Sequence, residues 1–223
     1  MNPASADYIR AYMPERRVDA DKAALVIVDM QHATGSRFGA LGRRLQAEGS
    51  SVGDYRFDRI ERVALPNLAR LLAHFRLLGR PVVHVTMGSA LPDAADAPPH
   101  MRRLFVECHN HLGSPDHAIL DALKPLPGEH LVRKTTIGAF ASTGIDALLR
   151  ALGVEQLWMG GVSTNMCVET TAREAADRGY LVTLVEDGCA TTHEDLHQGT
   201  VRNFQRLFGR VRSTDDSLHE LGR

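Results

Sequence analysis

Cysteine is scarce in this sequence of 223 residues, which contains only Cys108, Cys167 and Cys189. The three form no C-x-x-C pair and no spacing typical of a zinc site, and an odd number cannot pair completely. A scaffold held together by disulfide bonds is therefore not expected. Reduced thiols, and hence a cytoplasmic location, are the better expectation.

The sequence also lacks an excess of charge of either sign, since 26 Lys and Arg residues face 27 Asp and Glu residues. Without a basic patch there is no sign of a nucleic-acid partner. The first 17 residues lack the apolar core of a signal peptide. The longest apolar runs, such as AALVIV, are far too short to span a membrane, so no membrane association is expected.

The chain does contain short apolar segments that alternate with helical patterns, and we find no internal repeat and no low-complexity linker. Such alternation predicts an α/β fold, a three-layer sandwich with a mostly parallel sheet of about six strands between helices. We expect one domain, residues 1–223, with residues 1–20 as an N-terminal extension. Strands are predicted at residues 23–29, 81–86, 130–134, 156–161, 180–187 and 210–213. Helices are predicted at residues 59–79, 142–153, 166–179 and 193–208.

Three chemically active residues follow or end predicted strands. Asp29 ends the first strand, Lys134 ends the third, and the loop after the fourth leads to Cys167. Parallel strands place their carboxyl ends on one edge of the sheet, where ligands bind. Alone, each residue has an ordinary structural interpretation: a turn cap, a solvated lysine and a packed thiol. Together they have the composition of a nucleophile with a base and a cation.

The position of Cys167 favours a reactive thiol. A helix N-terminus and the nearby Lys134 would both lower its pKa. Asp29 could accept the thiol proton and later pass it to a leaving amine. Backbone N–H groups between Ser163 and Cys167 could stabilise an oxyanion at the helix start.

Three segments resemble the isochorismatase-like cysteine hydrolase family: ALVIVDMQ, RKTTIGAFASTGIDALLRALG and QLWMGGVSTNMCVETTAREAADRGYLVTLVEDGCAT. They occur in the family's order, from about residue 23 to the late 190s. The resemblance implies an isochorismatase-like, Rossmann-like fold and a catalytic triad of Asp29, Lys134 and Cys167. It also implies a cis peptide between Val162 and Ser163, with the Ser163 and Cys167 amides as the oxyanion hole. Members of the family usually form homodimers or homotetramers.

Within the family, the presence of Cys167 favours hydrolysis of a C–N bond through a thioester. The substrate would be a small carboxamide, ureide or carbamoyl compound, with biuret-like and triuret-like molecules favoured. The Asp-x-His metal motif of the family's nicotinamidases is missing, so no metal and no other cofactor is expected. His100, His109 and His111 are left as possible contacts to substrate or metal. The alternatives are a nicotinamidase-like amidase and a catalytically silent member that binds a small ligand.

Contacts to the substrate are harder to assign. Gln31 and Asn165 carry amide groups that could bind a polar substrate, but each could equally cap a loop. Residues 37–58 show no obvious core pattern and are interpreted as an insertion that could cover a neighbouring subunit or rim a pocket. Within it, Phe38 is the chosen substrate contact, with Arg37 and Tyr55 as further candidates.

Overall fold

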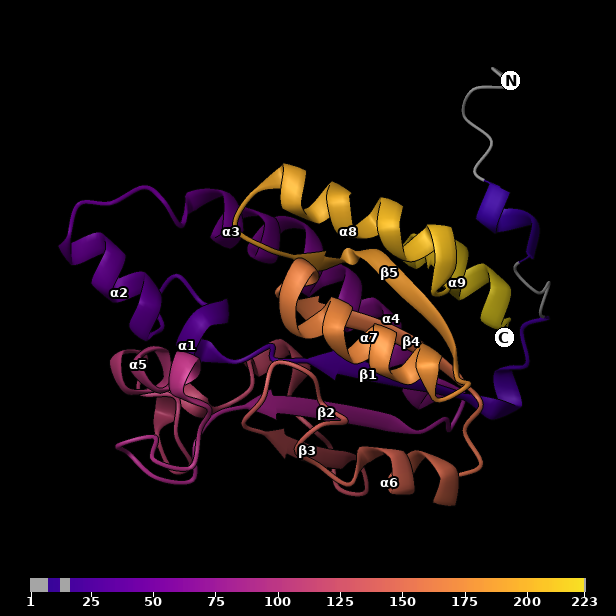
Figure 1. Ribbon diagram of the computed structural model, residues 1–223, viewed down its shortest axis with the longest axis horizontal. Helices are drawn as coiled ribbons and strands as arrows, with labels where there is room; N and C mark the ends of the chain where they lie inside the picture. The colour runs from indigo at the N-terminus through magenta and orange to yellow at the C-terminus, as the bar shows by residue number, and fades with distance from the viewer. Residues whose placement is uncertain (1–7, 13–16, 223) are drawn as a thin grey trace.

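The computed structural model describes residues 8–12 and 17–222 (Figure 1). The predicted N-terminal extension, residues 1–20, therefore lies partly outside the described residues. Its described part contains a 3-10 helix, Tyr8–Tyr12, which lies beside the helix Glu194–Leu207. A second 3-10 helix, Ala20–Lys22, leads into the first strand.

A six-stranded sheet forms the centre of the molecule, and every pairing between its strands is parallel. The strand order is β3-β2-β1-β4-β5-β6. The bounds are β1 Ala23–Val28, β2 Val82–Met87, β3 His130–Lys134, β4 Gln156–Val162, β5 Leu181–Ala190 and β6 Arg210–Arg212. The order reverses between β1 and β4, which is the switch point where open α/β sheets bind ligands.

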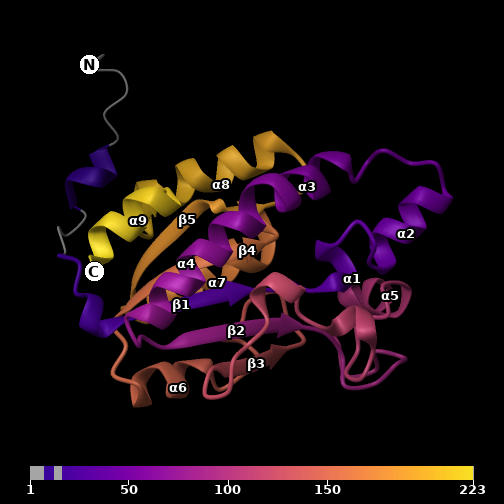
Figure 2. The same cartoon turned by 180° about the vertical axis from the view of Figure 1, so that it is seen from behind.

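Helices cover both faces of the sheet, as the two opposite views show (Figures 1 and 2). One face packs against α4 and α9, and the other against α6, α7 and α8. Alternate residues of β1 enter the two cores, which explains why this strand is apolar throughout. The bounds are α4 Leu65–Leu77, α6 Ile145–Ala151, α7 Glu169–Asp177, α8 Glu194–Leu207 and α9 Thr214–Leu221.

Four short helices gather beyond the carboxyl edge of the strands, at the left of Figure 1. They are α1 His32–Gly35, α2 Ala40–Ala47, α5 Pro99–Glu107 and the 3-10 helix Pro115–His117. The helix α3, Asp54–Arg59, continues through a π-helical segment, Ile60–Ala64, into α4. Another 3-10 helix spans Asp121–Leu123. Within the described residues, no helix has both the length and the apolar character needed to cross a membrane.

The predicted fold class is confirmed, and so are all six strands, with shifts of a few residues at their ends. The expectation that residues 37–58 contribute nothing to a core was wrong, because this segment forms α2 and most of α3 and buries Leu45 and Phe57. Its role as an insertion beside a pocket or a neighbouring subunit stays a prediction. The helix predicted over residues 59–79 is divided before Pro66. The π-helical segment precedes α4, so the proline lies in the first turn of α4, where its missing N–H costs no hydrogen bond.

Candidate active site

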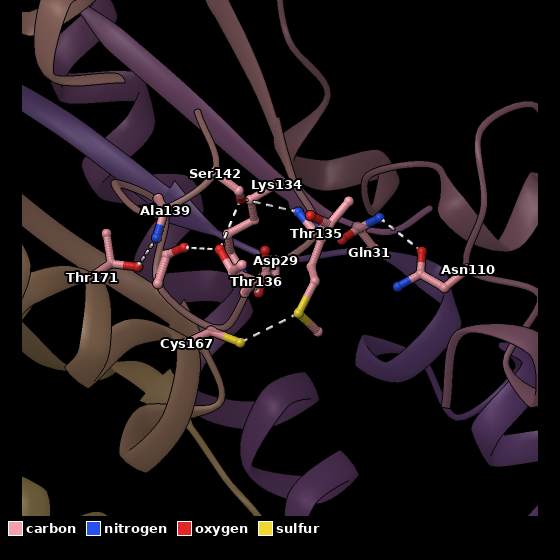
Figure 3. A network of polar contacts seen from close by, with 12 residues as sticks. Asp29, Gln31, Asn110, Lys134, Thr135, Thr136, Ala139, Ser142, Cys167 and Thr171 are labelled. Carbon is pink, nitrogen blue, oxygen red and sulfur yellow. Dashed lines mark hydrogen bonds and ion pairs between the residues drawn. The ribbon is translucent and has the colours of Figure 1, made fainter. Parts of the chain in front are cut away.

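The three residues from the strand ends meet at the switch point of the sheet. Asp29 directly follows β1, Lys134 is the last residue of β3, and Cys167 follows β4. Figure 3 shows their side chains in one polar network. Lys134 is fully buried, while Asp29 and Cys167 are each 3% exposed. The sheet topology therefore brings residues far apart in the sequence into one closed site.

Asp29 and Lys134 form a buried ion pair, with 2.8 Å between Oδ2 and Nζ. The Lys134 ammonium also donates to the carbonyl of Thr136 at 3.1 Å. Among the described residues, Oδ1 of Asp29 has no hydrogen-bond partner, so it is free to accept a proton. Burial raises the pKa of Asp29, and the positive charge of Lys134 opposes this rise. Burial alone would lower the pKa of Lys134, but Asp29 and Cys167 raise it, so the lysine stays charged.

Cys167 lies in a π-helical turn, Thr164–Val168, whose N-cap residue is Ser163 and which continues into α7. Its Sγ is 3.7 Å from Sδ of Met87 (Figure 3). The expectation of a lowered pKa was wrong. Burial and the Asp29 carboxylate raise the pKa of Cys167 to about 12, and Lys134 only partly offsets them. Near neutral pH the resting site therefore holds a thiol beside a base.

The chain that leads to Cys167 has an unusual backbone. Gly161 has a φ of 129°, and a Cβ at this position would lie 2.0 Å from the carbonyl oxygen of Val28. The peptide bond between Val162 and Ser163 is cis. Asp29 has a φ of 53°, in the left-handed region that Asp tolerates better than most residues. The role of the Ser163 and Cys167 amides as an oxyanion hole stays a prediction.

A second loop supports the turn that carries Cys167. The segment between β3 and α6 donates a backbone hydrogen bond from Ala139 to Oγ1 of Thr171, at 3.1 Å (Figure 3). The Phe140 amide donates to the Glu174 carboxylate at 3.0 Å. Because Thr171 and Glu174 belong to α7, these bonds connect the loop after Lys134 to the helix after Cys167.

Gln31 lies next to the site, but protein groups occupy its amide. Its Oε1 accepts a hydrogen bond from the Met87 amide at 2.8 Å. Its Nε2 donates to the carbonyl of His117 at 2.8 Å and contacts Oδ1 of Asn110 at 3.2 Å. The side chain is 1% exposed. Gln31 therefore braces the ends of two strands, and a substrate contact would require one of these bonds to break.

The other proposed substrate contacts lie in different surroundings. Asn165 is in the π-helical turn, two residues before Cys167, and its Oδ1 accepts a 2.5 Å hydrogen bond from Thr191. Phe38 is 79% exposed, so its ring does not pack against Asp29, Lys134 or Cys167 in the described residues. Arg37 pairs with acidic side chains of α3 and its continuation, and Tyr55 hydrogen-bonds to Glu194. For all of these residues a substrate contact stays a prediction.

The histidines considered as metal ligands do not converge. His109 lies 3.6 Å from the Asp116 carboxylate, and Nδ1 of His111 is 3.1 Å from the carbonyl of Leu112. His100 is exposed in the first turn of α5. Among residues 8–12 and 17–222, no group of three or more His, Cys, Asp or Glu side chains is placed to hold a metal ion.

Sequence reasoning missed a buried cation beside the triad. Arg56, in α3, is only 5% exposed, and its Nη1 donates to Oγ of Ser163 at 2.6 Å. One turn later, Arg59 donates to the neutral ring of His197, which in turn contacts Thr164. The signal in the sequence was an arginine pair spaced for one helix face, with Arg56 in the segment interpreted as an insertion and Arg59 at the start of the next predicted helix.

Comparison with known proteins gives consistent matches. The model of the isochorismatase domain family matches residues 23–216. The ureidoacrylate amidohydrolase RutB of Methylorubrum extorquens is 31% identical over 216 residues, covering 86% of this chain and 80% of that protein. The RutB protein of Variovorax paradoxus is 28% identical and covers 88% and 80%.

Solved structures share the architecture. A cysteine hydrolase from Pseudomonas syringae pv. phaseolicola has a TM-score of 0.77 at 23% identity, covering 93% of this chain and 95% of that one, which shows the fold alone. N-carbamoylsarcosine amidase from Thermoplasma acidophilum has a TM-score of 0.64 at 25% identity and covers 87% and 97%. Both resemblances extend over nearly the whole chain.

Proposed function

Because the chain belongs to the isochorismatase domain family, we propose that it is a cysteine amidohydrolase. It cleaves a C–N bond of a small ureide or carbamoyl compound and passes through a thioester. The observation that carries this proposal is the buried Asp29–Lys134 ion pair of 2.8 Å beside the Cys167 thiol. A nucleophile, a base and a cation within one closed site are what acyl transfer requires.

The first half of the reaction makes the thioester. As Sγ of Cys167 bonds to the substrate carbonyl carbon, the thiol proton moves to Oδ1 of Asp29. The carbonyl electrons move onto oxygen, where the amides of Ser163 and Cys167 stabilise the charge. When the C–N bond breaks, Asp29 returns the proton to the leaving nitrogen, which departs as ammonia or an amine. Lys134 keeps the Asp29 carboxylate in place throughout.

The second half releases the product. A water molecule gives a proton to Asp29 while its oxygen bonds to the thioester carbon. The C–S bond then breaks, and the Cys167 sulfur takes the proton back from Asp29. The raised pKa of Asp29 suits this work, because a carboxyl that holds a proton more readily is a better carrier between sulfur, nitrogen and water.

The relatives support a ureido or carbamoyl substrate. The matched RutB proteins are named for ureidoacrylate, and the structural neighbour is named for N-carbamoylsarcosine. Both names describe a carbamoyl group on a nitrogen. The biuret-like and triuret-like preference suggested by the sequence stays a prediction within this class, and so does assembly into a homodimer or homotetramer.

Replacing the nucleophile tests the proposal. We expect Cys167→Ser to release ammonia from ureido and carbamoyl substrates at least ~10³-fold more slowly than the wild-type protein, with an unchanged circular dichroism spectrum. Cys108→Ala is the matched control, because Cys108 is a buried thiol that the mechanism does not use. Mass spectrometry of the wild-type protein with substrate should detect acylated Cys167.

The screen should include biuret, triuret, ureidoacrylate, N-carbamoyl amino acids and nicotinamide. Ammonia from nicotinamide alone would favour the nicotinamidase-like alternative. If no substrate released ammonia and Cys167→Ser changed nothing, the silent, ligand-binding alternative would replace the proposal.

A further inference from the structure

Arg56 is a buried charged side chain that the mechanism above does not use. It is 5% exposed and lies on α3, whose carboxyl end continues into the long helix behind the sheet. Its Nε donates to the carbonyl of Thr34 at 2.9 Å, and its Nη1 donates to Oγ of Ser163 at 2.6 Å. These two bonds use two of the five N–H donors of the guanidinium, so the others are available to a ligand.

No carboxylate of the described chain neutralises Arg56 within ion-pair distance. Its neighbour on the same helix differs, since Arg59 has the Glu194 carboxylate 3.6 Å away. The charges around the nucleophile can be counted. Asp29 and Lys134 cancel, and the Cys167 thiol is neutral, so Arg56 leaves these four groups with one uncompensated positive charge. Buried charges are normally paired, which points to an anionic ligand.

The bond to Ser163 places Arg56 at the start of the turn that carries Cys167. The negative forms of Cys167 and Asp29 both raise its pKa, against a larger lowering by burial, which brings it to about 10. The guanidinium therefore stays charged near neutral pH. Its partner Ser163 is the N-cap of the turn that carries Cys167. An anion held by Arg56 would thus belong to the same molecule as the carbonyl under attack.

We propose that Arg56 binds a carboxylate of the substrate, so that the site selects ureido or carbamoyl acids over neutral ureides such as biuret. This inference rests on the proposed function and narrows its substrate class. A planar guanidinium fits a carboxylate through parallel N–H···O bonds, and in a dry site such a bond is strong. The carbamoyl end would lie at Cys167, and the acid end at Arg56. Arg56 is a specificity-determining residue in this scheme.

Two matched substrates test the proposal. N-carbamoylglycine carries the carboxylate, and 2-hydroxyethylurea replaces it with a neutral hydroxymethyl group. The wild-type protein should prefer the acid by about 100-fold in kcat/KM. Arg56→Met should lower kcat/KM for the acid by about 100-fold, mainly through KM, and change the neutral compound by less than about 3-fold. Arg56→Lys keeps the charge but loses the planar fork, so its loss should be intermediate.

Arg62→Met is the control, because Arg62 lies two turns further along the same continuous helix with an exposed side chain. It removes the same charge from the surface and should leave both substrates unaffected. Equal losses on both substrates in Arg56→Met would overturn the proposal and assign Arg56 to catalysis or structure. A wild-type protein without preference for the acid would overturn it too, even if Arg56→Met failed to fold.

A binding measurement separates this proposal from the proposed function. In Cys167→Ser, N-carbamoylglycine should raise Tm, and 2-hydroxyethylurea at the same concentration should raise it much less. The added substitution Arg56→Met should abolish the difference. Selective binding without ammonia release by the wild-type protein would support Arg56 and refute the hydrolase. Ammonia release from both compounds without selective binding would support the hydrolase and refute the role of Arg56.

Discussion

The thiol of Cys167 is kept protonated by its surroundings in the resting protein. Many catalytic cysteines are stored as thiolates because a cation or a helix N-terminus lowers their pKa. Here the Asp29 carboxylate and burial together outweigh Lys134 and raise the pKa of Cys167 to about 12. In the proposed mechanism the thiolate therefore forms during the attack on the substrate, with Asp29 as the proton acceptor.

Removing the carboxylate should separate thiol acidity from catalysis. In Asp29→Asn, Lys134 keeps its charge but loses its buried counter-ion, and the Cys167 thiolate becomes the group that can replace it. We expect the pKa of Cys167 to fall and its alkylation by iodoacetamide at pH 8 to speed up by about tenfold per unit of that fall. Turnover should be lost at the same time. The rate is followed by mass spectrometry of the Cys167 peptide, and slower alkylation would contradict the prediction.

The sequence was enough to bring together the three residues to which we assign the chemistry, but not to predict their electrostatics. Asp29, Lys134 and Cys167 could be named because each stands at or after the end of a recognisable strand. The direction of the thiol pKa could not be predicted, since it depends on burial and on the distance to Asp29. Arg56 was missed because its burial depends on Ser163, a partner 107 positions away.

Among the elements, β4 and the turn that follows it place Cys167, the proposed nucleophile. The strand runs so close to β1 that Gly161 has no room for a side chain, and its φ of 129° is a conformation that other residues rarely adopt. The chain then enters the π-helical turn with Cys167. The position of Sγ thus depends on how closely two backbones approach each other in the centre of the sheet.

Substituting this glycine should damage stability and activity together. We expect Gly161→Ala to lower the free energy of unfolding by about 3 kcal/mol or more, because the new Cβ would meet the Val28 carbonyl. Gly199→Ala is the matched control, since Gly199 lies inside α8 with no atom near its Cβ position. It should stabilise the protein by ~0.5–1 kcal/mol. Urea denaturation measures both changes, and equal stabilities of the two variants would contradict this account.

The strands and long helices could be predicted from the sequence much more accurately than the structure of residues 37–58. Strands buried on both faces are apolar throughout, and glycine marks the ends of several helices, so their positions were predicted within a few residues. Residues 37–58 form two short helices with few apolar residues, and their burial comes from contacts with distant segments. Hydrophobic periodicity has too few positions there to reveal a helix.

At the scale of the whole molecule, three histidines are buried among the described residues, His84, His117 and His197, and burial lowers the pKa of each. Burial, followed by the charge of Arg133, lowers the pKa of His117 to about 4. Burial, followed by the charge of Arg59, has the same effect on His197. His117 contacts the Gln31 amide on one side of the site, and His197 contacts Thr164 behind the nucleophile turn. Both histidines therefore connect the stability of the fold to the shape of the site.

The stability of the whole fold should fall in mild acid. An unfolded histidine takes up a proton below about pH 6.5, whereas these two resist protonation down to about pH 4. Their contribution to the free energy of unfolding is thus complete above pH 6.5. It is lost as the pH falls toward 4, at up to about 1.4 kcal/mol per pH unit for each histidine. Urea denaturation between pH 7 and 5 measures the slope. His117→Gln and His197→Gln should each make the slope smaller, with His84 contributing to what is left, and an unchanged slope in both would refute the assignment.

Burial of the triad also has a consequence for kinetics. Lys134 is inaccessible, Cys167 and Asp29 are each 3% exposed, and the Met87 thioether lies against the nucleophilic sulfur. A carbonyl carbon cannot come within bonding distance of Sγ until something moves, and the flexible Met87 side chain is the smallest obstacle. In the proposed mechanism, each catalytic cycle therefore begins with an opening step that precedes the chemistry. The rate of substrate binding would then depend on how often the Met87 side chain moves aside, as well as on how often substrate and protein collide.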